Sequence, residues 1–319
     1  MLSARYLGPS DYGLINYAAS LVAFIVPIMQ LGLNSTLVQE VICDPEHEGE
    51  TLGTALAMTF TSSIACIIGV TTVAAFLNQG ETETILVCTL YSLLLLFQSL
   101  EMIQYWFQAK LLSKYTSLTI LAAYVVVAAY RITLLITGRS VYWYAVSQAI
   151  DFAIIAFVLL FLYRKVSGSK LRFSAKRAAE MLGRSKHYIL SSMMIVVFAQ
   201  TDRVMLKLML NEEAVGYYSA AVSSTTLTAF VFVAIIDSFR PSILESRQMS
   251  TEAFHQGMKT LYAVIIILAL LQSVLIAVLA EPVIRILYGT EYGTSVGALR
   301  IVVWFATFSY LGAVRDVWI

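Results

Sequence analysis

The sequence predicts an all-α protein with many membrane-spanning helices, and three observations support this fold class. Of the 319 residues, 59% are apolar and 13% are charged, and the mean hydropathy is +0.78. Soluble domains contain about 45–50% apolar and about 25% charged residues, so a water-soluble fold could not hide this much apolar surface. Apolar runs of about 20 residues recur along the chain, which is the length that a helix needs to cross a bilayer. Runs such as residues 152–163 are continuously apolar and lack the alternation of barrel strands.

Nine apolar runs are predicted as membrane spans, and most of the charge lies between them. Lys and Arg number 21 and Asp and Glu number 20, but only eight of these 41 residues lie inside the runs. The predicted spans are residues 12–33, 51–77, 84–106, 115–137, 141–163, 187–209, 215–238, 260–280 and 296–314.

The segments between the spans differ in character along the chain. A predicted turn with Gly and Pro at residues 5–13 precedes the first span, and the segment at 34–50 becomes acidic. The aromatic residues at 105–107 end the third span, where they fit an interfacial belt or a sugar-stacking surface. A long basic loop follows at 164–186, and the longest loop on the opposite side is at 281–295.

The distribution of basic residues predicts the orientation of the spans. Because each span reverses the chain, the loops fall into two sets. One set holds 14 basic residues and comprises residues 34–50, 107–114, 164–186, 239–259 and 315–319. The other set holds three, namely Arg5, Arg139 and Arg285. Positive charge favours the cytoplasmic side, so the first set, which includes the loop at 164–186, is predicted to be cytoplasmic.

A short internal repeat precedes two of the spans. Residues 7–13 (LGPSDYG) and 210–216 (LNEEAVG) share Leu and Gly at the same spacing, and both are followed by Ala and Ser at matching positions. A third copy at 287–293 (LYGTEYG) resembles the first closely. Gly and Pro permit tight turns, and small residues allow close helix contact. The repeat predicts two halves with the same orientation in the membrane, although Gly-Tyr turns are also common at membrane interfaces.

The repeat also predicts a domain organisation. An N-terminal bundle is expected at 1–163, a basic cytoplasmic linker at 164–186 and a C-terminal bundle at 187–319. If each half has six helices, one helix is expected before Met1 and two are expected after Ile319.

Several motifs resemble the polysaccharide or O-antigen flippases, which belong to the multidrug/oligosaccharidyl-lipid/polysaccharide exporter superfamily. The motifs are ARYLGPSDYG (4–13), LGLN (31–34), YWFQA (105–109), TDRVML (201–206) and EAVGYYSAA (213–221). Their order and the hydropathy profile cover essentially the whole chain. One departure is at residues 39–50, which read Gln-Glu and then become acidic where members often carry arginine.

The resemblance implies a MATE-like fold of two bundles around a central cavity. It implies a flippase that moves undecaprenyl-pyrophosphate-linked oligosaccharide repeat units across the cytoplasmic membrane. Such a protein would supply O-antigen, capsule or exopolysaccharide synthesis. Membrane lipid is an expected partner, and a polysaccharide polymerase and chain-length proteins are further candidates. No cofactor is expected, although transport could be coupled to H⁺ or Na⁺.

Charges inside predicted spans are the candidate site residues, because an intramembrane charge costs about 2.5–3.5 kcal/mol on insertion scales. The candidate substrate-binding cations are Arg131, Arg203, Lys207 and Arg300, with Arg240 just beyond a span end. Guanidinium groups suit a pyrophosphate. The candidate coupling or pairing acids are Glu101, Asp151, Asp202 and Asp237. The same charges could instead pair between helices or extend to the headgroups.

The basic loop at 164–186 has two interpretations that the sequence leaves open. It could attract anionic lipid, with an amphipathic helix from 174 to 182, or it could serve only to fix the topology.

Other functions have weaker support. A drug or cation antiporter of the same superfamily should have a cavity dominated by acids, whereas these spans hold four acids and four bases. A polysaccharide polymerase or ligase needs a base or metal site, but the three histidines lie in loops or at a span edge. A purely structural scaffold would not need charged residues inside the membrane, where they are costly. The net charge of +1 argues against nucleic-acid binding, and Cys43, Cys66 and Cys88 lack metal-site spacing.

Overall fold

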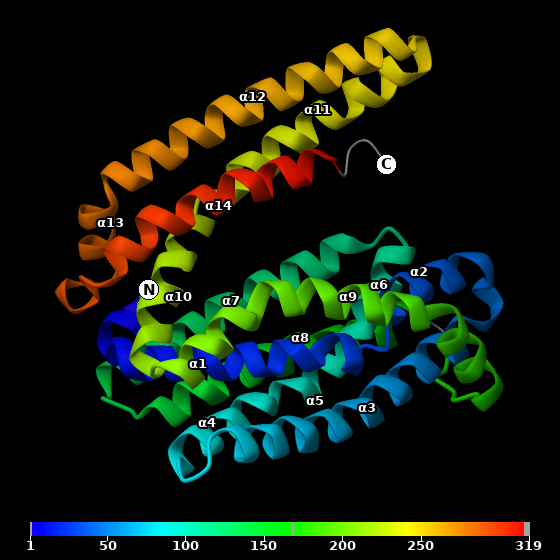
Figure 1. The fold of residues 1–319 in the computed structure, drawn as a ribbon. Coiled ribbons are helices and arrows are strands. Elements are labelled where there is room, and N and C mark those ends of the chain that lie inside the picture. The colour runs from blue at the N-terminus through cyan, green and yellow to red at the C-terminus, as the bar shows by residue number, and fades with distance from the viewer. Residues whose placement is uncertain (1, 168, 316–319) are drawn as a thin grey trace. The chain divides into compact units, whose positions relative to one another are not determined.

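The computed structural model describes residues 2–167 and 169–315, and it shows an all-helical chain. Within this part of the chain, nine helical segments are long and apolar enough to cross a membrane. They coincide with the nine runs predicted from the sequence, and the predicted fold class is confirmed. Figure 1 shows the helices in chain order.

Most spans are single helices, while some are interrupted. The first part of the chain contains α1 (Leu2–Met29), α2 (Leu33–Cys43), η1 (Pro45–His47), α3 (Glu48–Leu77), α4 (Thr82–Ser92), α5 (Leu94–Gln98), η2 (Ser99–Glu101) and α6 (Met102–Ala109). The remainder contains α7 (Ser113–Ile136), α8 (Val141–Val166), α9 (Ala175–Met209), α10 (Glu212–Thr226), α11 (Ala229–Met249), α12 (Thr251–Val278), α13 (Ala280–Leu287), η3 (Thr290–Tyr292) and α14 (Ser295–Arg315).

Two segments expected as loops are mostly helical. Residues 5–13 belong to α1, which bends at Gly8 (φ 75°, ψ 173°) and resumes at Pro9. Proline suits the first turn of a helix, and glycine alone adopts this backbone conformation readily. Residues 34–43 form most of α2 after a left-handed Gly32. The sequence prediction was wrong here because it ended each helix where the apolar run ends.

The third span is divided by polar residues. The side-chain hydroxyl groups of Ser92 and Ser99 each donate a hydrogen bond to the backbone carbonyl three residues earlier. Thr59 of α3 donates to the Ser99 carbonyl over 3.0 Å. These side chains compete for backbone groups, and the span is therefore split into α4, α5, η2 and α6.

The chain divides into two compact units. One, called here the larger unit, is Leu14–Glu212, and the other, the smaller unit, is Met1–Gly13 with Glu213–Ile319. These limits differ from the division expected from the sequence, because α9 is grouped with the larger unit. The expected transport bundles at 1–163 and 187–319 stay a prediction.

The larger unit has two apolar clusters. One joins α2, α3, α6 and α8 around Leu37, Leu52, Phe107 and Leu159. The other joins α1, α3 and α5 around Val22. Figure 1 shows α3, α5 and α8 lying lengthwise beside one another.

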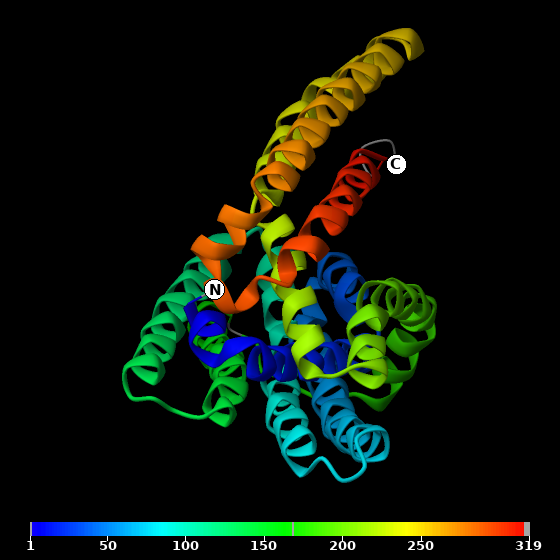
Figure 2. The same ribbon diagram turned by 60° about the vertical axis from the view of Figure 1, so that its left-hand side comes forward.

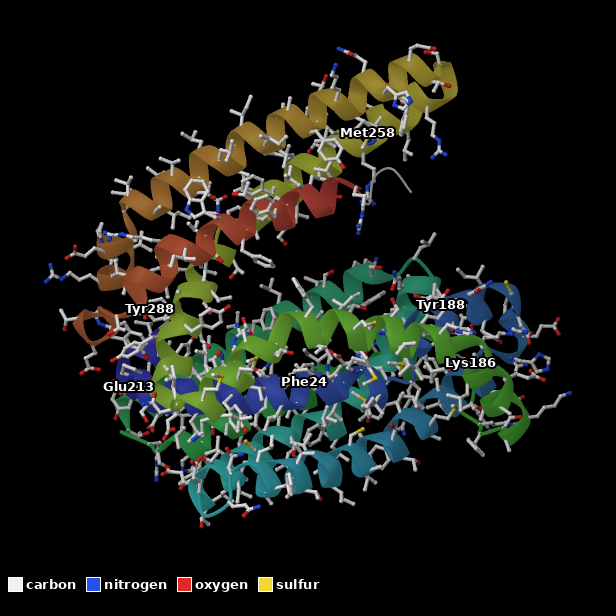
Figure 3. The ribbon with its side chains drawn as sticks, viewed as in Figure 1. Phe24, Lys186, Tyr188, Glu213, Met258 and Tyr288 are labelled. Carbon is white, nitrogen blue, oxygen red and sulfur yellow. The ribbon has the colours of Figure 1, made fainter. Side chains whose placement is uncertain are left out.

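The smaller unit is built on a long antiparallel pair, α11 and α12, with α14 beside α12 (Figure 2). Phe232 of α11 stacks on Tyr310 of α14 with ring centroids 3.9 Å apart. A second cluster gathers α10, α13 and the first residues of α1 around Tyr288 and Tyr292. In Figure 3, Met258 and Tyr288 lie toward opposite ends of this unit.

Candidate functional site

Arg131 lies in a polar patch between α7 and α8 of the larger unit. Its Nε donates to Ser147 Oγ over 3.1 Å, and a terminal nitrogen donates to Gln148 Oε1 over 3.0 Å. Both partners are neutral. In the part of the chain that the structure describes, no carboxylate lies within ion-pair distance of Arg131. Its positive charge is therefore held in place without being neutralised.

Two acids lie close to this patch. Asp151 follows Ser147 by one helical turn on α8 and is 6% exposed. Its Oδ1 has no hydrogen-bond partner among the described residues. Glu101 of η2 lies beside Gln98 and within electrostatic reach of Asp151. No described Lys, Arg or His forms an ion pair with either acid. Arg131 lies within electrostatic reach of Asp151 but forms no direct ion pair with it, so the two acids have no contacting counter-ion among the described residues.

The polar side of α9 contacts α1. Ser20 Oγ donates to Gln200 Oε1 over 3.1 Å, and Arg203 donates to the same oxygen over 2.6 Å. Asp202 Oδ1 accepts a hydrogen bond from the backbone N–H of Arg203. Asp202 and Arg203 thus hydrogen-bond to polar groups on α9 itself.

Lys207 is buried between two glutamates. Its side chain is 5% exposed, and its Nζ lies 2.7 Å from Glu81 Oε2 and 2.9 Å from Glu212 Oε2. The ammonium holds the pKa of Glu81 below its usual value. Lys207 therefore forms two ion pairs, and its role in substrate binding stays a prediction.

The remaining candidates belong to the smaller unit. Asp237 and Arg240 are both exposed, and their side chains lie 4.0 Å apart at a spacing of three residues on α11. Arg300 is exposed on α14. The structure therefore distributes the nine candidates over several sites in two units, and their roles in transport stay predictions.

The first and third copies of the internal repeat, and the last four residues of the second copy, lie in the smaller unit. Tyr292 of the third copy donates to the carbonyl of Ala4 over 2.7 Å, and its ring packs edge-on against Tyr12 of the first copy. Gly216 of the second copy packs so closely on Pro9 that a Cβ would lie 2.8 Å from its carbonyl carbon. Burial raises the pKa of Tyr288 to about 12 and also raises that of Tyr292. The sequence revealed the similarity of the copies but not their contact.

Sequence reasoning missed an ion-pair network between the acidic segment and the basic linker. Arg177 lies 2.8 Å from Asp44, 3.6 Å from Glu50 and 3.8 Å from Glu40, and it donates to Thr51. Arg184 also pairs with Glu40. The Arg177 guanidinium lowers the pKa of Asp44 to about 2, with a further hydrogen bond from His47. The available signal was that two segments of opposite charge were predicted on the same side of the membrane.

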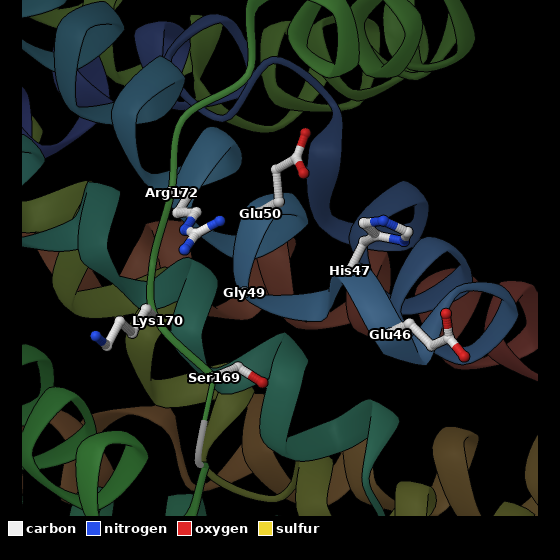
Figure 4. Close-up of a pocket in the computed structure, with 7 residues that line it drawn as sticks. All are labelled: Glu46, His47, Gly49, Glu50, Ser169, Lys170 and Arg172. Atoms are coloured by element: carbon white, nitrogen blue, oxygen red, sulfur yellow. The ribbon is translucent and has the colours of Figure 1, made fainter.

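Glu48 makes a second connection at the same end of the larger unit. Its carboxylate lies 2.6 Å from Lys110 Nζ after α6 and accepts hydrogen bonds from Ser167 and Ser169 in the linker. An open pocket of about 380 Å³ lies beside these contacts (Figure 4). It is lined by Glu46, His47, Gly49, Glu50, Ser169, Lys170 and Arg172. Because both signs of charge line it, the pocket selects neither an anion nor a cation.

Nine apolar helical segments, intramembrane charges and a charged linker together define an α-helical, multi-pass membrane protein. Its fold is that of the MATE transporters. The chain is similar to an inward-facing multidrug resistance transporter of the MATE family in the MOP superfamily, with a TM-score of 0.68 and 13% identity. The match covers 99% of this chain and 78% of that chain. Likeness at this identity concerns the fold alone.

The family is defined by the sequence itself. Residues 2–297 match the model of the polysaccharide biosynthesis protein family, and the chain belongs to that family. No curated protein matches the chain. The resemblance predicted from the motifs is confirmed at the level of a polysaccharide exporter with a MATE-like fold.

Proposed function

We propose that the protein is a flippase for undecaprenyl-pyrophosphate-linked oligosaccharide repeat units in the cytoplasmic membrane. The family match and the transporter fold support an exporter for polysaccharide synthesis. O-antigen, capsule or exopolysaccharide would be the product, and a polymerase and chain-length proteins would act next. A protein of this kind moves its substrate by alternating access and makes no covalent bond.

The single observation that favours an anionic substrate is that the hydrogen-bond partners of Arg131 are neutral. Neutral Ser147 and Gln148 hold its guanidinium, so the charge remains available to a pyrophosphate. Lys207 differs, because two glutamates already neutralise it. Arg131 is therefore our first choice for a substrate cation, ahead of Lys207.

The acids near Arg131 support coupling to a cation. Asp151 is buried, has an oxygen without a partner and lies near a second acid, Glu101. We propose that this pair takes up H⁺ or Na⁺ during the cycle. Asp151→Asn should abolish the dependence of transport on the ion gradient, whereas retained dependence would assign coupling elsewhere.

Substrate transport can be tested with Arg131→Gln in proteoliposomes that contain a fluorescent lipid-linked pyrophosphate oligosaccharide. Loss of a charge-assisted contact should slow translocation about 10- to 100-fold. Arg139→Gln is the matched control, because Arg139 lies in a loop and its guanidinium lies over the face of Trp143. Equal rates for the native protein and Arg131→Gln would contradict the assignment.

A cation-coupled multidrug antiporter is the second candidate. The similar structure is a multidrug resistance transporter, and Glu101 and Asp151, which form no ion pair among the described residues, would suit a cationic substrate. Efflux of a cationic dye that depends on Asp151 but not on Arg131 would favour this function over the flippase.

A further inference from the structure

Helix α9 contacts the rest of the larger unit mainly through charged and polar groups. Its buried residues are few, namely Met181, Ser185 and Lys207, whereas α8 buries ten residues. Large apolar side chains of its middle part are exposed, and they are Tyr188, Leu190, Met194, Ile195, Val197 and Phe198. Figure 3 shows Tyr188 and Lys186 on this helix. Apolar burial therefore does little to hold α9 in place.

The first fastening is at the start of α9. We call the ion-pair network of Arg177 and Arg184 with Glu40, Asp44 and Glu50 the clasp. Arg177 is 16% exposed on its side chain, and it contacts carboxylates from α2, from the α2–α3 connection and from α3. One guanidinium thus connects α9 to three successive segments of the chain.

The backbone of the linker fits a glycine face of α3. The N–H of Arg172 donates to the carbonyl of Gly49 over 3.2 Å, and the N–H of Ser174 donates to Thr54 over 3.0 Å. A Cβ on Gly53 would lie 2.6 Å from the Arg172 nitrogen, so only glycine admits the linker this closely. Figure 4 shows the linker running past Gly49 at Arg172 and Lys170.

Two more contacts complete the docking. The carbonyl of Ser185 lies against Gly32, where a Cβ would be 2.7 Å away, and the Ser185 side chain is fully buried. At the far end of α9, Lys207 pairs with Glu81 across the α3–α4 turn. Ion pairs of this kind weaken with salt and can separate without exposing a large apolar core.

We propose that α9 is a strap that undocks from the larger unit and docks again during the transport cycle, with the clasp as its releasable fastening. The proposal rests on the proposed function, because it assigns a moving part to a transporter. The proposal explains the acidic segment at 40–50 and the basic residues of the linker together. Attraction to anionic lipid, or a role in fixing the topology, would explain only the basic residues.

Ser185 provides a probe of docking. A single cysteine is introduced as Ser185→Cys in a protein that carries Cys43→Ser, Cys66→Ala and Cys88→Ala. Its reaction rate with a maleimide reports exposure of the docked face. Arg177→Glu should raise that rate on the order of tenfold, because several ion pairs, each worth a factor of about two to five, are lost together.

The controls separate the clasp from general damage. Lys176→Glu makes the same change of charge at the adjacent exposed residue and should leave the rate unchanged. Adding Asp44→Arg to Arg177→Glu restores opposite charges and should return the rate toward its original value. High salt should also raise the maleimide reaction rate of the variant that keeps Arg177, so this test needs no mutation in the clasp. Equal rates for Arg177→Glu and Lys176→Glu, or no effect of salt, would overturn the clasp.

Undocking during transport is tested in membranes. The rate at Ser185→Cys is compared in cells that make lipid-linked oligosaccharide and in cells whose first glycosyltransferase is deleted. A higher rate with substrate present supports the strap. An equal rate in a strain where export is intact overturns the strap and leaves the flippase standing, whereas absent export would contradict the proposed function instead.

Discussion

The contact between Gly216 and Pro9 gives the sharpest prediction about the fold. A Cβ at Gly216 would lie 2.8 Å from the Pro9 carbonyl carbon and 3.2 Å from its Cα, and it would be closer still to the carbonyl oxygen. The obstacle is backbone, which cannot rotate away as a flexible side chain can. Gly216→Ala therefore forces the first and second copies of the repeat apart.

The net effect follows from two opposing terms. Overpacking a close contact costs about 1–3 kcal/mol, while alanine in a helix gains up to about 1 kcal/mol over glycine. The smaller unit should lose about 1–2 kcal/mol of stability, and the Tm of the purified protein should fall by a few degrees. Thermal unfolding in detergent, followed by near-ultraviolet circular dichroism, measures this change through the tyrosine cluster.

The matched control is Gly297→Ala in the same unit. Gly297 lies in α14, and a Cβ there would meet no atom within 4 Å. Alanine at this position should raise the Tm slightly or leave it unchanged. An unchanged Tm for Gly216→Ala, or an equal fall for both variants, would refute the claim that the repeat copies pack backbone against backbone.

Three further predictions concern the larger unit. Gly53→Ala should displace the linker and speed its cleavage by trypsin several-fold, whereas Gly69→Ala, which has open space, should not. Lys207→Met leaves two glutamates unpaired and should lower the unfolding free energy by about 1–2 kcal/mol, as measured by chemical denaturation. Asp44 has a folded pKa of about 2 against an ordinary 3.8, so its contribution is complete above 3.8 and is lost as the pH falls through about 2. In that window, acid should weaken the contact of Arg177 with Asp44 and so loosen the linker, and Asp44→Asn should remove this part of the acid dependence.

The spans were predictable because a bilayer imposes length and hydropathy on every helix that crosses it. Helical structure beyond the apolar runs, as in α2, was not predictable in this way, because polar helix ends carry no hydropathy signal. The kink at Gly8 coincides with a Gly-Pro pair, which did indicate a break. What the sequence could not show was that the helix resumes immediately afterward.

The candidate charges were identified by residue type, but their partners depend on contacts between distant residues. Lys207 and Glu81 are 126 residues apart, and Arg177 and Asp44 are 133 apart. A single sequence gives no measure of such proximity. The complementary signs of the 34–50 and 164–186 segments were visible, and they are the one clue that could have indicated the clasp. The contact between Asp237 and Arg240, which are three residues apart on one helix, depends only on local geometry.

The most direct test of the account is the location of lipid-linked repeat units in cells that lack this gene. Intact inverted membrane vesicles are treated with a membrane-impermeant glycosidase, which reaches only the cytoplasmic leaflet. The account predicts that deletion makes the repeat units accumulate in that leaflet and that the native gene reverses this, while Arg131→Gln reverses it weakly. Repeat units that reach the outer leaflet at the normal rate without the gene would contradict the flippase function.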